Sequence, residues 1–349
     1  MATKHDALRV IPLAILGAAA WGAACLVRER RRISFRDKTV VISGASRGLG
    51  LELARGFVAE DARVVLLARE RDELRNVADE FERYGDRVAV LECDVRKQDE
   101  VRRTVAAIFE RFGAIDVLIN NAGIIQVGPV EHMKIEDFID AMEVHFWGPL
   151  YLLLEIVPYM KSRRQGRIVN ITSIGGKVAV PHLLPYVASK FALVGLSEGL
   201  RAELLKDGIY VTTVCPGLMR TGSHLNALFK GQHEKEFALF SIANASPLLS
   251  TSSGRAARKI IEACRYGKAE IFITPQARLL HLANSLFPGL IAESLSLIGR
   301  TLPGASGAEG DILKRGWESR SRLAPSFLTR PADRAAARNK EHPRLVSGS

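Results

Sequence analysis

The sequence predicts a doubly wound α/β fold, in which helices cover both faces of a parallel sheet. Short apolar runs with the length of buried strands alternate with amphipathic segments with the length of helices, from Lys38 to about residue 274. This alternation is typical of a parallel sheet covered on both faces. A glycine-rich turn follows the first apolar run, and polar residues follow several others. Open α/β sheets bind ligands at the carboxyl ends of their strands, so the same pattern locates the site.

Seven strands and six helices account for the alternation. Strands are expected at residues 39–43, 63–68, 87–91, 115–119, 167–171, 210–214 and 270–273. Helices are expected at residues 49–59, 71–84, 99–112, 135–161, 188–206 and 256–264. These elements define a catalytic domain at residues 34–275.

Three segments lie outside the regular alternation. Residues 218–253 contain no expected strand and follow the sixth strand, where a loop can close over the sheet as a substrate lid. Residues 276–302 are rich in Leu and Ile but interrupted by charges and Pro288, so we expect an amphipathic element that caps the domain or touches a membrane surface. Residues 303–349 are rich in Gly, Pro, Arg and Ser, which predicts a basic, largely disordered tail.

The amino-terminal segment has the composition of a membrane anchor. Residues 11–27 are apolar and uncharged, and a basic cluster at residues 28–32 follows directly. The apolar run is at the short end of lengths that span a bilayer. Because the basic cluster follows it, the positive-inside rule places the catalytic domain in the cytosol. We expect residues 1–33 to be a retained anchor; a cleaved signal peptide and an interfacial helix are the alternatives.

Composition and cysteine spacing argue against a nucleic-acid partner, a disulfide framework and a metal site. The formal net charge of the 349 residues is +11, but the basic residues concentrate in residues 28–38 and 314–344. Between these ends there is no basic patch interleaved with aromatic residues, which argues against a nucleic-acid partner. The four cysteines have neither paired nor metal-ligand spacing, so neither a disulfide framework nor a metal site is expected.

The turn after the first strand is suited to a dinucleotide. Residues 43–50 read SGASRGLG, with glycines at Gly44, Gly48 and Gly50. Glycines between a strand and a helix let the backbone approach a pyrophosphate, and the helix amino terminus supplies amide donors. The second strand ends in Arg69 without a carboxylate for a ribose 2′-hydroxyl. Arg47 and Arg69 can both face a 2′-phosphate, which predicts NADP(H) over NAD(H); two solvated arginines are the alternative.

Tyr186 and Lys190 form the candidate catalytic pair. Four positions apart on a helix, the two side chains lie on one face, and an adjacent ammonium stabilises a phenolate. Further polar residues follow other strands, where the sheet would gather them around this pair. They are Asp94, Asn121, Ser173 and the stretch Pro216, Gly217 and Thr221.

These motifs, in this order from about Lys38 to Thr274, resemble the short-chain dehydrogenase/reductase family of the NADP-preferring type. The resemblance implies a Rossmann-type, seven-stranded parallel sheet. It implies Tyr186 as the general acid toward a carbonyl oxygen, Ser173 as a hydrogen-bond donor to that oxygen, and Lys190 as the residue that binds the nicotinamide ribose and lowers the Tyr186 pKa. The implied cofactor-binding residues are Gly44, Ser46, Arg47, Gly48, Leu49, Gly50, Arg69, Asp94, Val95, Asn121, Ala122, Gly123, Tyr186, Lys190, Pro216, Gly217 and Thr221.

One position departs from the family pattern. The family usually has an asparagine where this chain has His145, and that asparagine orders a water in a proton relay to the lysine. An imidazole can also donate, accept and bind water, so a relay through His145 is one hypothesis. A packed helix histidine without a chemical role is the other.

The sequence favours a membrane-anchored, NADP(H)-dependent reductase, or the reverse dehydrogenase, that acts on a lipophilic carbonyl or alcohol. An anchor would place the site beside the bilayer, where such substrates partition. The alternatives are a 3-oxoacyl-type reductase with an incidental anchor and a non-catalytic NADP(H)-binding scaffold or sensor. The family resemblance also implies a homo-oligomer, a dimer or tetramer, paired through the helices at residues 135–161 and 188–206.

Overall fold

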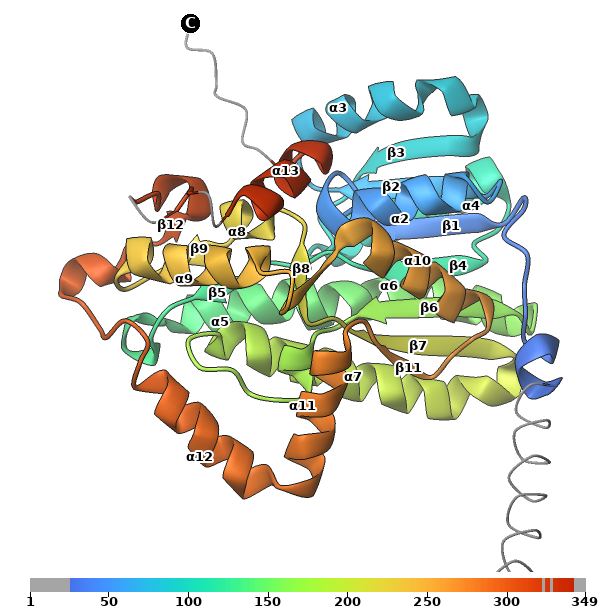
Figure 1. Ribbon diagram of the computed structural model, residues 1–349. Coiled ribbons are helices and arrows are strands. Elements are labelled where there is room, and N and C mark those ends of the chain that lie inside the picture. Colours follow the sequence, from blue (N-terminus) through green and yellow to red (C-terminus); the bar gives the residue numbers. More distant parts are fainter. Residues whose placement is uncertain (1–25, 322–323, 327–328, 342–349) are drawn as a thin grey trace, which may run out of the picture.

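The computed structural model describes residues 26–321, 324–326 and 329–341, with a seven-stranded sheet at its centre (Figure 1). The strands are β1 (Thr39–Ser43), β2 (Arg63–Ala68), β3 (Val88–Glu92), β4 (Val117–Asn120), β6 (Gly166–Ile171), β7 (Ile209–Cys215) and β11 (Glu270–Phe272). They lie in the order β3-β2-β1-β4-β6-β7-β11, and every neighbouring pair is parallel. The predicted doubly wound sheet of seven strands is confirmed.

Alternate residues of each central strand pack against different layers of helices. In β1, Val40 and Ile42 face α2 (Gly48–Val58) and α10 (Ser253–Arg265). Val41 points to the other face, toward α4 (Gln98–Phe112) and α6 (Gly148–Ser162). Each fully buried aliphatic side chain contributes about 1.5–3 kcal/mol through removal from water. Both faces of the sheet are therefore covered, which holds the carboxyl ends of its strands in fixed positions.

The helices agree with prediction in position but differ at their ends. α7 (Leu184–Leu204) begins four residues before the expected start, because Pro185 fits a first helical turn, where no amide donor is required. Tyr186 and Lys190 therefore lie in its first two turns. The expected helix at residues 135–161 is α5 (Ile135–Met142) and α6, joined by a π-helical segment (Glu143–Trp147). α3 (Arg71–Phe81) covers β2 and β3.

The lid segment contains strands, so the prediction that residues 218–253 lack them is wrong. β8 (Leu218–Arg220) pairs with β10 (Ser250–Ser252), and β9 (Leu228–Phe229) lies between β5 (Gln126–Val127) and β12 (Lys314–Arg315). Strands of two or three residues are too short to show an alternating pattern. Two helices, α8 (Ser223–Asn226) and α9 (His233–Ala245), complete the lid.

The segment at residues 276–302 forms two helices, α11 (Pro275–Leu286) and α12 (Pro288–Gly299), which extend from the body of the molecule (Figure 1). Apolar side chains at their junction are exposed: Leu286 to 70%, Phe287 to 59% and Leu290 to 66%. Residues 1–25 of the expected anchor lie outside the described residues; its apolar run at residues 11–27 is described only at positions 26 and 27, which belong to a helical turn at residues 26–30. Within the described part of the chain, no helix has the length and apolarity needed to span a bilayer.

The prediction of a largely disordered tail is wrong for the part of the tail that the structure describes. Residues 303–341, apart from the gaps at 322–323 and 327–328, carry β12, two 3₁₀ turns and α13 (Arg330–Arg338). Ala324, Ala332 and Ala336 are fully buried. Two alanines four residues apart give α13 an apolar stripe that needs little side-chain ordering, a signal that the Arg-rich composition hides.

Candidate active site

A cavity of about 770 Å³ opens at the carboxyl ends of β1, β4, β6 and β7. The glycine-rich turn lines one end, and Ser173, Tyr186 and Lys190 line the other together with the lid. Every predicted site residue borders this cavity except Gly50. A Cβ atom on Gly50 would lie 2.2 Å from the Gly44 carbonyl oxygen, so this glycine permits close packing of α2 on the turn.

The glycine-rich turn is braced from the neighbouring strand. Gly44 and Gly48 have φ of 63° and 60°, a region that disfavours residues with side chains. The Asn121 side-chain amide donates to the carbonyl oxygens of Ser43 at 3.0 Å and Gly44 at 2.9 Å. The Ala122 amide donates to the Ser43 hydroxyl. Asn121 was expected to hold the dinucleotide. Instead, both donors of its side-chain amide bind carbonyl oxygens of the turn.

A carboxylate that the sequence did not reveal engages the predicted 2′-phosphate site. Glu73, in the first turn of α3, accepts a hydrogen bond from the Ser46 hydroxyl at 2.7 Å and forms an ion pair with Arg47. Arg69 pairs with the adjacent Glu70 at 2.8 Å and is half-exposed. Glu73 lies 26 positions beyond Arg47, with no motif to link them, so only the fold brings the two together.

Asp94 follows β3 and borders the cavity through a fixed carboxylate. The Arg96 guanidinium and amide donate to its oxygens, the shortest bond being 2.7 Å. Burial opposes ionisation of Asp94, but the hydrogen bonds from Arg96 outweigh burial and lower the pKa of this carboxyl. Asp94 is therefore an anchored acceptor at the edge of the cavity, beside Val95.

Ser173 and Tyr186 meet at the end of β6. The Ser173 hydroxyl caps a 3₁₀ turn by accepting from the Gly175 amide at 3.0 Å. It borders the same cavity as the Tyr186 hydroxyl. Burial raises the pKa of Tyr186 above its usual value, against the effect of Ser173. The phenol is therefore held protonated, the form that a general acid requires.

Lys190 lies behind the phenol, on the next turn of α7. It is 4% exposed, its ammonium donates to the Ile171 carbonyl oxygen at 2.9 Å, and it lies 5.6 Å from the centre of the Tyr186 ring. Burial lowers the pKa of Lys190 to about 7. Burial is the largest influence on the titration of both residues. The lowering of the Tyr186 pKa by Lys190 stays a prediction.

The third side of the cavity comes from the end of β7 and the start of the lid. The Pro216 carbonyl oxygen accepts from the Ile174 amide at 2.8 Å, which ties this turn to the Ser173 turn. Gly217 lies so close to Thr274 that an added Cβ would be 2.8 Å from its hydroxyl oxygen. Thr221 is buried and accepts the Ser223 amide with its hydroxyl at 3.1 Å. These residues fix the start of the predicted lid segment, residues 218–253, several of which line the cavity.

His145 is fully buried in the π-helical segment, and both ring nitrogens have protein partners. The Ile124 amide donates to Nε2 at 3.2 Å, which places the proton on Nδ1, 2.8 Å from the Ser189 hydroxyl. That hydroxyl donates to the Tyr186 carbonyl oxygen. Burial, and then the charge of Lys190, lower the pKa of His145 well below its usual value, so the ring is neutral. The ring also contacts Tyr186 edge-on at 5.4 Å.

This geometry favours a positioning role for His145 over a proton relay. His145→Asn should keep kcat within about tenfold of the parent, since a carboxamide can supply one donor and one acceptor. His145→Ala leaves the Ile124 amide and Ser189 without this partner and should lower Tm by several degrees more. Parallel kinetics and thermal melts test this; complete loss of turnover in a well-folded Asn variant would instead assign the imidazole a specific chemical role.

Part of the remaining cavity wall is apolar, and the sequence carried no signal for it; polar residues such as Asn226, Asn244 and Arg315 line other parts of the wall. Ile125, Val180 and Leu183 come from loops of the main domain, and Phe240 comes from α9 of the lid. These residues lie far apart in the chain and belong to no motif. They give an apolar part to the wall of the same cavity that Ser173 and Tyr186 line.

Comparisons with known proteins agree with this geometry. Residues 38–228 match the short chain dehydrogenase family. A dehydrogenase/reductase SDR family protein 7-like from Anopheles gambiae is 34% identical over 79% of this chain and 89% of its own. A putative ketoacyl reductase from Streptomyces coelicolor is 39% identical over 53% of this chain and 72% of its own. The crystal structure of a metagenomic short-chain oxidoreductase in complex with NADP has a TM-score of 0.51 and 34% identity, covering 54% of this chain and 86% of that one.

Proposed function

The chain belongs to the short-chain dehydrogenase/reductase family, and from this we propose that it is an NADP(H)-dependent oxidoreductase for a lipophilic carbonyl or secondary alcohol. The observation that carries the proposal is that Ser173, Tyr186 and Lys190 line one cavity together with apolar residues such as Leu183 and Phe240. The glycine-rich turn lies at the other end of the same cavity. One elongated molecule can therefore reach from the turn to the hydroxyls.

Each catalytic residue has a role that its contacts support. The protonated Tyr186 hydroxyl donates its proton to the carbonyl oxygen of the substrate. The Ser173 hydroxyl, fixed by the Gly175 amide, donates a hydrogen bond to the same oxygen and keeps it in place. Lys190 offers its remaining ammonium donors to ribose hydroxyls, which restores the solvation that burial removes. The nicotinamide supplies the hydride.

The residues that line the cavity fit NADP(H). Gly44 and Gly48 present backbone without side chains to the pyrophosphate, and α2 begins at this turn. Ser46, Arg47 and Arg69 are the donors for the 2′-phosphate, which would take the place of the Glu73 carboxylate. A putative ketoacyl reductase and an NADP-bound oxidoreductase among the similar proteins support the same cofactor and reaction class.

Removing both arginines should change cofactor choice. Arg47→Ala with Arg69→Ala should raise the Kd for NADPH by about tenfold to a hundredfold, because two charge-assisted contacts to the 2′-phosphate are lost. The Kd for NADH should change by less than about threefold, since NADH lacks that group. Fluorescence titration measures both, with Arg75→Ala on the exposed face of α3 as the matched control. An equal rise in the Kd for NADPH and for NADH would contradict the assignment of Arg47 and Arg69 to the 2′-phosphate.

The substrate class follows from the walls of the cavity. Ile125, Val180, Leu183 and Phe240 offer little to a polar substrate, whereas apolar contacts favour a long hydrocarbon or ring system. The test is NADPH consumption with ketosteroids, retinal, long-chain 3-ketones and short polar ketones, using a chain that lacks residues 1–33. Turnover of long apolar carbonyls is expected. Turnover of short polar ketones alone would refute the lipophilic assignment.

Two alternatives are separated by the same assay. A 3-oxoacyl-type reductase would favour 3-oxoacyl thioesters over the other carbonyls, in keeping with the ketoacyl reductase relative. A non-catalytic NADP(H)-binding scaffold would bind NADPH without turnover in either direction. The presence of Ser173, Tyr186 and Lys190 in one cavity favours an enzyme over a scaffold. We further propose that the chain forms a homo-oligomer. A molecular mass equal to that of a single chain, measured by light scattering, would refute this proposal.

We also propose that the junction of α11 and α12 inserts into the surface of a membrane, in addition to the anchor expected at residues 1–33. Leu286, Phe287 and Leu290 are exposed together at this turn, an arrangement suited to a lipid interface. Vesicle flotation of the chain lacking residues 1–33 tests it. Phe287→Glu with Leu290→Glu should reduce binding about tenfold or more, and Ile135→Glu on α5 should not. Equal flotation of both variants would rule out this surface.

A further inference from the structure

The last described residues form a strap that crosses the cavity. The C-terminal strap comprises residues 329–341, with α13 and the three residues that follow it. Figure 1 shows α13 beside α3 and above α8. Ala336 packs so closely on Gly222 that an added Cβ there would lie 2.5 Å from the alanine side chain.

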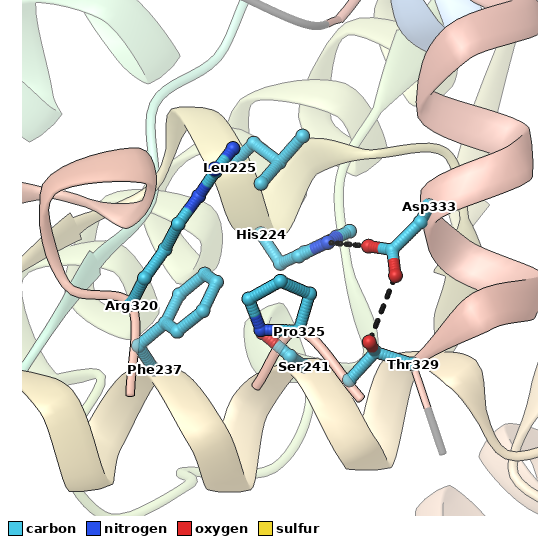
Figure 2. A pocket seen from close by; sticks show the side chains of 8 residues that line it. All are labelled: His224, Leu225, Phe237, Ser241, Arg320, Pro325, Thr329 and Asp333. Carbon is cyan, nitrogen blue, oxygen red and sulfur yellow. Dashed lines mark hydrogen bonds and ion pairs between the residues drawn. The ribbon is translucent and has the colours of Figure 1, made fainter. Parts of the chain in front are cut away.

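Side chains of α13 fasten the strap to the lid. Asp333 accepts from His224 of α8 at 3.4 Å and from the Thr329 hydroxyl at 2.8 Å, as Figure 2 shows. The Asn339 side-chain amide donates to the Thr221 carbonyl oxygen at 3.3 Å and to the Ser253 hydroxyl at 3.1 Å. The strap is therefore bound to the same segment that we assign to the lid.

On the opposite side, the strap is fastened to the dinucleotide half. The Lys340 ammonium donates to the Asn76 carbonyl oxygen at 2.6 Å and pairs with Glu80 at 2.9 Å, both on α3. Arg338 pairs with Glu52 of α2 at 3.1 Å. With one edge on the lid and the other on α2 and α3, the strap bridges the mouth of the cavity.

Between these fastenings the strap contacts the glycine-rich turn itself. The Gly48 amide donates to the Asn339 carbonyl oxygen at 3.0 Å. A Cβ on Gly48 would lie 2.4 Å from Oε1 of Glu341, whose carboxyl is 4% exposed and lines the cavity. A carboxyl group thus fills the space that the glycine leaves open, and a strap carbonyl takes a donor of the turn. Both belong to the pyrophosphate site of the proposed function.

We propose that the C-terminal strap is autoinhibitory, so that strap docking and dinucleotide binding at the glycine-rich turn exclude each other. This inference rests on the proposed function, because it assigns the turn to the pyrophosphate. The Glu341 carboxyl and a phosphate are both oxygen groups that would occupy one position at the turn. The apparent Kd for the dinucleotide then equals the intrinsic Kd divided by the fraction of molecules with an undocked strap.

The ionisation of Glu341 gives strap docking a pH dependence. Burial raises the pKa of its carboxyl to about 7, against Arg47 and the Asn226 hydrogen bond, while Glu73 acts in the same direction as burial. Lys340 is the neighbouring charge on the strap itself. The docked carboxyl binds a proton that the released one gives up, so docking weakens as pH rises from about 4.5 to about 7. Inhibition should be stronger at about pH 6 than at about pH 8.

The test measures NADPH affinity of the full chain by fluorescence titration. Glu341→Ala should lower the apparent Kd by about fivefold or more at pH 6, with a smaller effect at pH 8. Glu309→Ala, at an exposed carboxylate of the same tail, is the matched control and should leave affinity unchanged. A chain ending at Thr329 lacks residues 330–341 of the strap and should bind at least as tightly as Glu341→Ala.

Hydrogen exchange gives a second readout that does not depend on a substitution. Addition of NADPH to the unaltered chain should increase exchange across residues 330–341. Weaker NADPH binding by Glu341→Ala, or greater protection of the strap by NADPH, would overturn the inference by making the strap part of the binding site. Equal NADPH affinity of all variants would overturn only the autoinhibitory role of the strap. Failure of every variant to bind NADPH would overturn the proposed function as well.

Discussion

Tyr186→Phe should lower kcat by about 10³-fold or more while leaving the Kd for NADPH within about twofold of the parent. The substitution removes one oxygen atom, which is the proton donor in the proposed reaction. The aromatic ring remains to pack against His145, so the first turns of α7 and the position of Lys190 should be retained. Loss of turnover with retained binding is therefore the signature of a lost general acid.

The measurement pairs steady-state NADPH oxidation with fluorescence titration. Tyr159→Phe on α6 is the matched control, because its hydroxyl also makes a protein hydrogen bond, to the Gly113 carbonyl oxygen, but lies outside the cavity wall. That variant should retain nearly full activity. If Tyr186→Phe kept more than about a tenth of the parent kcat, another group would have to supply the proton, and the role assigned to the phenol would be wrong.

The sequence was sufficient for those parts of the fold and site that depend on local pattern. Strands such as residues 39–43 are short apolar runs buried on both faces, and the glycine-rich turn needs backbone that only glycine provides easily. Ser173, Tyr186 and Lys190 were found for the same reason, since strand ends and helix spacing fix where they project. The structure confirms that they lie together in one cavity.

The remainder depended on contacts between distant residues. Glu73 meets Ser46 and Arg47 only because α3 folds back over the turn, and its carboxylate is one of many acidic residues in the sequence. Glu341 lies nearly 300 positions beyond Gly48, in a stretch whose composition predicted disorder. Short strands in the lid are stabilised by pairing with each other, so no property of each strand alone could identify them.

Lys190→Met should impair binding and turnover together, which distinguishes it from Tyr186→Phe. The ammonium is buried against the Ile171 carbonyl oxygen and is positioned to bind ribose hydroxyls in the proposed complex. Its loss should raise the Kd for NADPH by about tenfold, through lost charge-assisted hydrogen bonds, and lower kcat by about 10²-fold or more. Titration and steady-state kinetics measure both; unchanged NADPH affinity would contradict a ribose-binding role.

The same substitution should increase stability in a pH-dependent way. Burial lowers the pKa of Lys190 from 10.5 to about 7, so between these values the unfolded chain binds a proton that the folded chain does not. The contribution of Lys190 to stability therefore rises as pH increases from about 7 to about 10.5 and is least favourable below that window.

Methionine fills similar space without a charge to desolvate. The Tm of Lys190→Met should exceed that of the parent most at about pH 6, and the difference should shrink toward about pH 9.5. Lys206→Met, at an exposed lysine just beyond α7, should show no such trend. A difference that grew with pH would mean that the fold stabilises the charged ammonium, and the buried lysine would then need an anionic partner.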